Sequence, residues 1–534
     1  MATLPLGDAF HVYDTTLRDG AQREGIAYSV TDKLAVARLL DEYGVGFIEG
    51  GWPGALPKDT EFFARARTDL ALTTAQLVAF GATRKAGIDV REDPQVQALL
   101  DSGAPVITIV AKSDVRHVEE ALRTTNEENL AMVADTVRYL REHDRRVFVD
   151  LEHFFDGYDH DPGYGVRVLE AAFSAGADVG VLCDTNGGML PKGIYDVVSD
   201  VLARSGVRLG IHCQDDTGCA IANSVSAVQA GVTHVQCTAN GYGERTGNAD
   251  LFSVVANLET KLAMPVLPEG RLRETMRVSH AIAEIANIAP DTHQPYAGVS
   301  SFAHKAGLHA SALKVNQELY NHIDPAVVGN DQRILITEMA GRASVEMKSR
   351  ELGLDLAGDP AALGKVVDRV KDLESRGWTF EAADASFELM ILEERDGARP
   401  QPFTVESWRV IVEQHADGSV MSEATVKVYA GGERVITTAE GNGPVNALDR
   451  ALRHALVKLF PSLDAVRLTD YKVRILEGVA GTDAVTRVLI GSSDGSEDWS
   501  TVGVHENVIA ASWMALEDAL AYSLLHASAP AADG

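Results

Sequence analysis

Cysteine is scarce in this sequence, and the few cysteines present are not closely paired. The 534 residues include four cysteines, and no two of them form a C-x-x-C pair. Zinc ribbons and disulfide frameworks depend on closely spaced cysteines, so neither is expected. The four residues, which we expect to be reduced cytosolic thiols, are Cys183, Cys213, Cys219 and Cys237.

Basic residues are also much fewer than acidic ones. The chain has 48 lysines and arginines against 77 aspartates and glutamates, a formal net charge of -29. Nucleic acids and anionic membranes bind basic surfaces, so neither is expected as a partner. An anionic small molecule would need a positive pocket set into this acidic surface.

Long apolar runs are missing as well. A membrane-spanning helix needs about 20 consecutive apolar residues, and no run approaches that length. The first residues, MATLPLGDAF, lack the basic region and the apolar core of a secretory signal. The expectation is a soluble, cytoplasmic protein, and its length favours more than one domain.

Short apolar runs alternate with helical patterns over residues 1–275, and this alternation predicts a (β/α)8 barrel of the α/β class. One of the helices is predicted over Asp32–Tyr43, with Thr31 as its N-cap and Gly44 just past its end. An open doubly wound sheet is the alternative, but no glycine-rich phosphate loop follows the first strand. The eight predicted strands cover residues 11–16, 45–51, 76–81, 106–113, 146–152, 178–187, 208–216 and 233–241.

The rest of the chain has a different character. Residues 276–395 are predicted to be mostly helical, and the charged, turn-rich segment ERDGARPQP (394–402) is the expected linker. Residues 403–528 then show a period of two, with hairpin signals at Asp417-Gly418 and Gly431-Gly432. Together with two helical segments, these strands predict a small α+β domain.

Polar residues gather at the ends of the predicted strands, where a barrel places its active site. His212 and Gln214 lie two apart on strand seven, so both side chains point the same way. With Asp19 and Asn248 they offer one nitrogen and several oxygens, a set that suits Mg or Mn better than Zn. The alternative is a core histidine with amides that only bond the loops, and the spacing alone leaves both interpretations open.

Other polar residues at this face allow two interpretations each. Arg18 beside Asp19 could form a structural ion pair, or it could stabilise an oxyanion next to a metal. Glu152, at the end of strand five, could be a surface carboxylate or a catalytic one. His309, in FAHKAGLHASALK (302–314), could be a helix-surface, core or acid–base histidine.

Three motifs together resemble a known superfamily. The chain is similar to the DRE-TIM metallolyases, in the branch that makes 2-isopropylmalate, homocitrate and citramalate. The resemblance covers nearly the whole chain. The motifs are YDTTLRDGAQ (13–22), the His-x-Gln of strand seven, and NGYGERTGN (240–248).

The remaining segments narrow the resemblance. GNGPVNAL (441–448) and STVGVHENVIAASWMALEDAL (500–520) resemble the allosteric domain of this branch. FAHKAGLHASAL, GWTFEAADASFELMI (377–391) and GNADL (247–251) are most similar to its citramalate-forming type. The implied domains are a catalytic barrel over 1–275, helical linker subdomains over 276–395 and an allosteric, dimer-forming domain over 403–528.

The resemblance implies a Claisen-type condensation of acetyl-CoA with a 2-oxo acid, followed by hydrolysis of the thioester. The citramalate-forming type implies pyruvate as the oxo acid, a role in isoleucine synthesis, inhibition by isoleucine and a homodimer. It also implies a divalent metal, which could be Mg, Mn or Zn. The implied metal ligands are Asp19, His212, Gln214 and Asn248.

The family's other functional residues also carry over. Arg18 would hold the alkoxide, and His309 would be the base, oriented by Glu152. Thr185 would bind the carboxylate of the oxo acid, and Tyr320 would lie near the thioester. Three alternatives stay open: a 2-isopropylmalate synthase that uses 2-oxoisovalerate, a lyase running the reverse cleavage, and an inactive amino-acid sensor.

Gln214 is where the sequence departs from the family, which usually has His-x-His. A glutamine offers a carbonyl oxygen in place of an imidazole nitrogen, so four ligands can persist with a harder donor set. Asp19, His212, Asn248 and Arg18 are all retained around it. We therefore interpret Gln214 as a working ligand.

Overall fold

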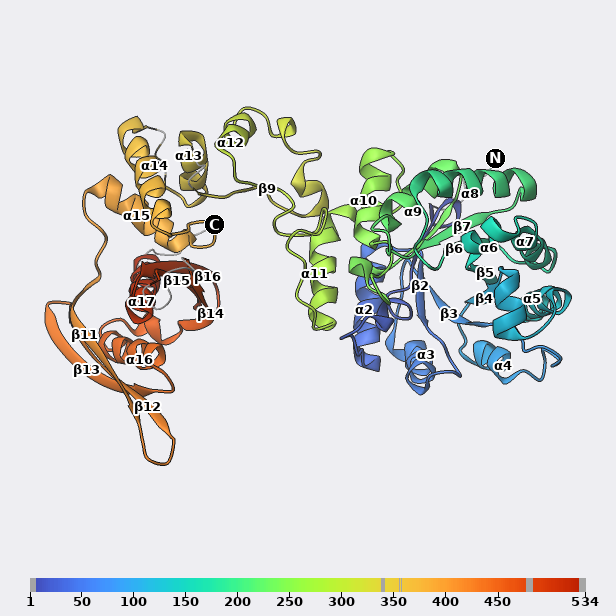
Figure 1. Ribbon diagram of the computed structural model, residues 1–534, viewed down its shortest axis with the longest axis horizontal. Helices are drawn as coiled ribbons and strands as arrows, with labels where there is room; N and C mark the ends of the chain where they lie inside the picture. The colour runs from blue at the N-terminus through green and yellow to red at the C-terminus, as the bar shows by residue number, and fades with distance from the viewer. Residues whose placement is uncertain (1–5, 338–340, 355, 357, 477–483, 528–534) are drawn as a thin grey trace. The chain divides into compact units, whose positions relative to one another are not determined.

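The computed structural model describes residues 6–337, 341–354, 356, 358–476 and 484–527. The chain forms two compact units (Figure 1). The barrel unit comprises residues 1–302 and 323–331, and the C-terminal unit comprises residues 303–322 and 332–534.

The barrel unit contains a closed sheet of eight strands, β1 to β8, in sequence order. Every neighbouring pair is parallel, and β8 returns to pair with β1. The (β/α)8 barrel predicted from the alternating pattern is confirmed. The strands are β1 (His11–Asp14), β2 (Phe47–Gly51), β3 (Gln76–Ala82), β4 (Val106–Lys112), β5 (Arg146–Glu152), β6 (Val179–Asp184), β7 (Leu209–Cys213) and β8 (His234–Cys237).

Helices connect the strands and follow the last of them (Figure 1). The α-helices are α1 (Leu6–Ala9), α2 (Val30–Tyr43), α3 (Pro57–Asp69), α4 (Pro94–Asp101), α5 (Asn126–Glu142), α6 (Phe154–His160), α7 (Tyr164–Ser174), α8 (Pro191–Ser205), α9 (Ala220–Ala230), α10 (Leu251–Lys261) and α11 (Thr275–Ile285). Shorter helical turns are η1 (Gly20–Gln22), η2 (His117–Leu122), η3 (Ala239–Gly241), η4 (Leu272–Glu274) and η6 (Pro325–Val328).

Helix α2 begins at Val30, two residues earlier than its sequence pattern predicts. Its N-cap is Ser29, not Thr31, because the Ser29 hydroxyl accepts the backbone N–H of Asp32. The Asp32 carboxylate in turn accepts the Ser29 N–H at 2.8 Å, which completes a capping box. At the other end, Gly44 adopts the predicted left-handed conformation with φ of 101°.

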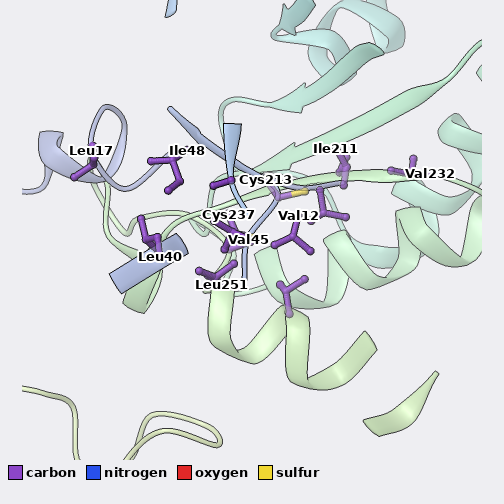
Figure 2. Packing of buried hydrophobic residues seen from close by; sticks show 14 of the residues in the cluster. Val12, Leu17, Leu40, Val45, Ile48, Ile211, Cys213, Val232, Cys237 and Leu251 are labelled. Carbon is purple, nitrogen blue, oxygen red and sulfur yellow. The ribbon is translucent and has the colours of Figure 1, made fainter. Parts of the chain in front are cut away.

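An apolar layer joins the strands to the helices around them. Figure 2 shows part of it, with Val12, Ile211 and Cys213 from the strands near Leu40 and Leu251 from the helices. Inside the barrel a second, aromatic-rich cluster includes Tyr13, Phe47 and Phe148. This packing fills much of the barrel interior, and the residues predicted as functional lie toward the carboxyl ends of the strands.

The C-terminal unit contains two three-stranded antiparallel sheets, ordered β11-β12-β13 and β14-β15-β16. Its strands are β9 (Ala303–His304), β10 (Arg333–Ile334), β11 (Phe403–Gln414), β12 (Val420–Ala430), β13 (Glu433–Gly441), β14 (Arg467–Ile475), β15 (Thr486–Ser493) and β16 (Asp498–His505). Its helices are α12 (Gly307–Leu313), η5 (Gln317–Leu319), α13 (Arg342–Glu351), α14 (Pro360–Ser375), α15 (Asp384–Asp396), α16 (Pro444–Leu456), η7 (Pro461–Asp464) and α17 (Val508–His526).

Both hairpin signals are confirmed. Strands β11 and β12 are joined across Asp417-Gly418, and Gly418 has a φ of 86°. Strands β12 and β13 are joined directly by Gly431-Gly432, whose φ values are 57° and 84°. Glycine is required at these turns because an L side chain is strained in the left-handed region.

Helix α17 is the one helix of the described residues that is long and apolar enough to cross a membrane. Of its most apolar window, 61% is buried inside the structure. The carbonyls of Ala515 and Ala519 accept hydrogen bonds from Thr501 and Trp499 of β16. Its apolar composition is therefore explained by packing on a sheet, as in the core helix of a soluble protein.

Candidate metal and active site

The turn that follows β1 carries Arg18 and Asp19 to the carboxyl end of the barrel. Strand β1 ends at Asp14, and η1 begins at Gly20. The backbone N–H of Asp19 donates to the Thr15 hydroxyl at 3.3 Å, which fixes the turn. Asp19 is only 6% exposed, so its carboxylate faces into the protein.

Asp19 meets three polar side chains from two other segments. Asp19 Oδ2 lies 3.6 Å from His212 Nε2, and Asn248 Nδ2 donates to Asp19 Oδ1 at 3.1 Å. Gln214 Nε2 lies 3.4 Å from the same His212 nitrogen. The four side chains predicted as metal ligands are therefore brought together, and all four are buried.

Two oxygens in this group have no partner. Gln214 Oε1 and Asn248 Oδ1 are buried and accept no hydrogen bond from the described residues. Asn248 Nδ2 donates to the Tyr242 carbonyl as well as to Asp19, so the orientation of its amide is fixed by acceptors. A buried acceptor without a donor costs free energy, and a bound cation would remove that cost.

This donor set fits a divalent cation. Ligand atoms at ~2.1 Å from one ion lie about 3 Å from each other in octahedral geometry. The four side chains converge on a similar scale: their closest polar atoms, which include the amide nitrogens of Gln214 and Asn248, lie 3.1 to 3.6 Å apart. A carboxylate, an imidazole and two unpaired amide oxygens form a hard, oxygen-rich set of the kind that suits Mg or Mn.

A glycine-rich loop positions Asn248. Asn248 pairs with Gln214 in an antiparallel bridge, and its backbone N–H donates to the Gly241 carbonyl at 3.0 Å. A Cβ at Gly247 would lie 1.9 Å from that same carbonyl oxygen, and one at Gly243 would lie 2.3 Å from Asn248 Nδ2. The glycines of NGYGERTGN are thus required by close approach, as well as by their positive φ values.

A chain of hydrogen bonds orients His212 from behind. His212 Nδ1 lies 2.9 Å from Gln236 Oε1, and Gln236 Nε2 donates to Asp150 Oδ1 at 2.8 Å. An amide oxygen can only accept, so the proton of the imidazole is on Nδ1 and the Nε2 lone pair faces Asp19. Burial, followed by the charge of Glu49, raises the pKa of Asp150 to about 8.

Arg18 is held in place beside the four predicted metal ligands. Its Nε donates to Glu49 Oε1 at 2.5 Å, its Nη1 lies 3.2 Å from Asp19 Oδ2, and its guanidinium stacks 3.9 Å over the Phe80 ring. Burial alone would lower the pKa of Arg18, but the carboxylates of Glu49 and Asp19 raise it well above its usual value. Arg18 is thus a fixed, permanent cation at the mouth of the barrel.

The same surroundings act on Asp19. Burial alone would raise the pKa of the Asp19 carboxyl, but Arg18, His212 and the Asn248 amide together hold it below its usual value. Asp19 is therefore ionised at neutral pH, as a metal ligand must be.

Thr185 and Glu152 lie at the same face. The Thr185 hydroxyl accepts the backbone N–H of His153 at 2.9 Å, and the Thr185 carbonyl accepts from Arg245 Nη2 at 2.8 Å. Glu152, the last residue of β5, forms an ion pair with Lys112, the last residue of β4. The Thr185 hydroxyl can accept this bond and still donate its own proton to a ligand.

His309 and Tyr320 belong to the C-terminal unit. Their rings stack with centroids 4.1 Å apart. Tyr320 is 40% exposed, so this pair lies at the surface of the unit. The two residues thus contact each other, and their predicted roles, His309 as the base and Tyr320 near the thioester, remain predictions.

Several residues at this face are not predicted from the sequence. Gln236 and Asp150 lie within strands that are apolar on both sides, so no periodicity distinguishes inward from outward positions. Glu49 is visible as a charge in β2, but its role as the partner of Arg18 is not. A polar residue inside a buried strand is the signal that could have found all three.

Three family models together match most of the chain. Residues 9–282 match the HMGL-like family, residues 297–377 match a homocitrate synthase post-HMGL domain, and residues 381–524 match the LeuA allosteric (dimerisation) domain. The chain is 66% identical, over 99% of both chains, to the (R)-citramalate synthase of Streptomyces coelicolor. The chain belongs to the (R)-citramalate synthase family.

Two less similar relatives also match this chain over nearly its whole length. The (R)-citramalate synthase of Aquifex aeolicus is 46% identical over 97% of this chain and 98% of its own. The 2-isopropylmalate synthase of Methanocaldococcus jannaschii is 28% identical over 97% of this chain and 96% of its own. The family predicted from YDTTLRDGAQ and its companion motifs is confirmed, and the chain is an enzyme of the citramalate synthase type.

Proposed function

We propose that the protein condenses acetyl-CoA with pyruvate and water to give (R)-citramalate and CoA. The observation that carries the proposal is the cluster of Asp19, His212, Gln214 and Asn248, with two unpaired oxygens, beside the fixed cation Arg18. The 66% identity to an (R)-citramalate synthase supports pyruvate as the oxo acid.

Asp19, His212, Gln214 and Asn248 would hold a divalent cation, which when bound acts as a Lewis acid toward the carbonyl of the oxo acid. Arg18 is positioned to stabilise the negative charge that develops on the carbonyl oxygen as the new carbon–carbon bond forms. Its bond to Glu49 fixes the guanidinium before the substrate arrives, so little reorganisation is needed.

Thr185 would bind the carboxylate of pyruvate. Its oxygen already accepts from the His153 backbone, so its hydroxyl proton is directed outward. The carboxylate would thereby be fixed relative to Arg18, and fixed orientation is a large part of catalysis of a two-substrate reaction.

The acetyl methyl group is a weak carbon acid, and a base must remove its proton. We propose His309 as that base, with Glu152 orienting it, and Tyr320, which stacks on His309, near the thioester. Water then cleaves the thioester, and the CoA thiol leaves. Lys112 pairs with Glu152 and helps to hold its carboxylate in place.

We further propose a cytoplasmic homodimer, formed through residues 403–528 and inhibited by isoleucine as the end product of its pathway. The domain division 1–275, 276–395 and 403–528 belongs to the same proposal. The match of residues 381–524 to an allosteric, dimer-forming domain supports it. A shift in melting temperature or activity with isoleucine tests the effector, and no shift with any branched-chain amino acid would remove it.

The activity is tested by mixing the protein with acetyl-CoA, pyruvate and Mg or Mn, and following free thiol and citramalate together. The proposal expects both products in equal amounts. Arg18→Lys is the matched variant: it keeps the charge but loses the Nε donor to Glu49 and should lower kcat. Absence of turnover in the parent would instead favour an amino-acid sensor without catalytic activity.

A further inference from the structure

A second group of ligand-type side chains lies outside the metal set. His117, Glu152 and His153 each offer a ligand atom, and these atoms all lie within 4.8 Å of one another. Glu152 ends β5, and His153 follows it with a left-handed φ of 54°. His117 is the first residue of η2, a π-helical turn after β4, and such turns are frequent at functional sites.

The imidazoles of His117 and His153 lie against each other. Their ring centroids are 4.1 Å apart, with the planes inclined at 34°. His153 Nδ1 lies 3.2 Å from Asp156 Oδ2, and the same carboxylate oxygen accepts from Asn186 Nδ2 at 3.0 Å. A carboxylate on one ring nitrogen leaves the other, Nε2, as the ligand and fixes the ring orientation.

Two cations lie beside the group, and each is paired with a carboxylate. Burial, followed by His153 and Lys112, lowers the pKa of His117. The ammonium of Lys112 contacts Glu152 Oε2, so we assign Oε1 to the ion. The charge of Arg116 is matched by Asp114, with which it forms an ion pair.

A cavity of about 390 Å³ adjoins the group, and its walls include His117, His153, Asp156 and Asn186. It leaves room for water or a small ligand at the remaining coordination positions. Three protein ligands with an open position is the arrangement that catalytic and exchangeable metal sites use, in contrast to the closed sites of structural zinc.

We propose that His117, Glu152 and His153 form a second, open site for a divalent transition metal such as Zn²⁺ or Co²⁺. Two imidazoles and one carboxylate favour these ions over Mg²⁺, which prefers oxygen ligands. The site thus differs in chemistry from the oxygen-rich set that contains Gln214, and one protein can bind different ions at the two places.

The position of the site gives it a consequence for turnover, and this consequence rests on the proposed function. The backbone N–H of His153 bonds the Thr185 hydroxyl, so the site borders the place proposed for the pyruvate carboxylate. An ion bound by Glu152 would engage the carboxylate to which the proposed function gives a catalytic part. Zn²⁺ should therefore inhibit when it fills the second site, and His117→Ala should relieve the inhibition without lowering basal activity.

Binding is tested first, with no substrate present, so that its result is independent of the proposed reaction. Full-length His212→Ala, which lacks a ligand of the first site, is titrated with Zn²⁺ by calorimetry and with Co²⁺ by its visible spectrum. His117→Ala and His153→Asn are then added singly. Asparagine tolerates the left-handed backbone at position 153, so this variant removes the ligand and keeps the fold.

The expected result is one Zn²⁺ per chain in the His212→Ala background, weakened at least about 10-fold by either added substitution. His160→Ala is the matched control. His160 is exposed and ends helix α6, whose N-cap is His153, so this substitution should leave binding unchanged. The proposal is overturned if His212→Ala binds no Zn²⁺, or if both His117→Ala and His153→Asn bind it as the control does. Circular dichroism confirms that each variant is folded.

Discussion

At the scale of single residues, the amide of Gln214 is the feature on which the metal site depends most. Its carbonyl oxygen is buried without a donor, and Asn248 shows the same property across the site. A buried amide oxygen without a donor costs free energy, and a bound cation would remove that cost at both residues. Gln214 therefore fits a ligand better than it fits a residue that only bonds its neighbours.

Loss of a residue that only supports a metal ligand typically lowers metal affinity by about 10–100-fold. We predict that Gln214→Ala, which removes a ligand itself, lowers the affinity for Mg²⁺ or Mn²⁺ by at least that much. Gln214→His should bind metal and shift preference toward Zn²⁺ or Co²⁺, because imidazole is a softer ligand. Calorimetric titration of both variants, with His212→Ala beside them, measures this. If Gln214→Ala binds within a few-fold of the parent while His212→Ala does not bind, Gln214 is not a ligand.

A second prediction concerns the bond between His212 and Gln236. Gln236→Met removes the acceptor for His212 Nδ1–H at similar volume, so the imidazole loses its fixed tautomer. Metal affinity should fall by about 10–100-fold with the fold intact. Thr108→Val, which removes a buried hydrogen bond to Tyr13 inside the same barrel, is the control.

Imidazole ¹⁵N resonances of His212 distinguish the two roles of Gln236. The positioning role requires a change in the tautomer signal in Gln236→Met, with none in Thr108→Val. An unchanged tautomer and unchanged affinity would mean that Gln236 serves only packing.

At the scale of elements, the loop from β8 to α10 carries out the positioning of Asn248. Gly247 has a φ of 95°, and a Cβ there would meet the Gly241 carbonyl at 1.9 Å. Gly218, in the loop after β7, also has a positive φ of 70°, yet a Cβ there would meet nothing within 4 Å. Both glycines have a backbone conformation that strains an L residue, but only Gly247 lacks room for a Cβ.

We predict that Gly247→Ala displaces Asn248 and lowers metal affinity at least 10-fold, as expected for loss of a ligand's support. Gly218→Ala carries only the left-handed penalty of about 1 kcal/mol and should bind metal normally. Melting temperature and metal titration of the pair separate the two effects. Equal losses of affinity in both variants would show that strain, and not the close approach, governs the site.

The helices and strands also show which features of the structure could be predicted from the sequence. The strands were predictable because buried parallel strands are apolar throughout, and the hairpins because their turns carry glycine. The N-cap of α2 was misplaced by two residues because Ser29 and Thr31 are both good caps, and only the reciprocal bond with Asp32 selects between them. The Asp150–Gln236–His212 chain depends on three-dimensional contacts that no local pattern encodes.

At the scale of the whole molecule, stability depends on groups far from the site. His11 and His234 lie at the amino end of the barrel, with their Nδ1 atoms 3.1 Å apart. Burial, then Arg208 and Arg146, lowers the pKa of His11 to about 2, and burial with the neighbouring His11 lowers that of His234 well below its usual value. Both imidazoles are therefore neutral in the folded protein.

Because these folded pKa values are depressed, the unfolded chain binds more protons below about pH 6.5, and stability falls as the pH falls. Each histidine contributes a slope of about 1.4 kcal/mol per pH unit in this window. His11→Asn should reduce the slope of the unfolding free energy between about pH 5 and pH 6.5 by that amount. Urea titrations check this against His143→Ala, an exposed control, and equal slopes would contradict it.

The molecule as a whole is proposed to condense acetyl-CoA with pyruvate. The most direct test compares kcat/KM for pyruvate and for 2-oxoisovalerate in one assay, following free CoA thiol from the full-length protein with Mg or Mn. The account predicts a higher kcat/KM for pyruvate. A higher value for 2-oxoisovalerate would make the protein a 2-isopropylmalate synthase and would contradict the central claim.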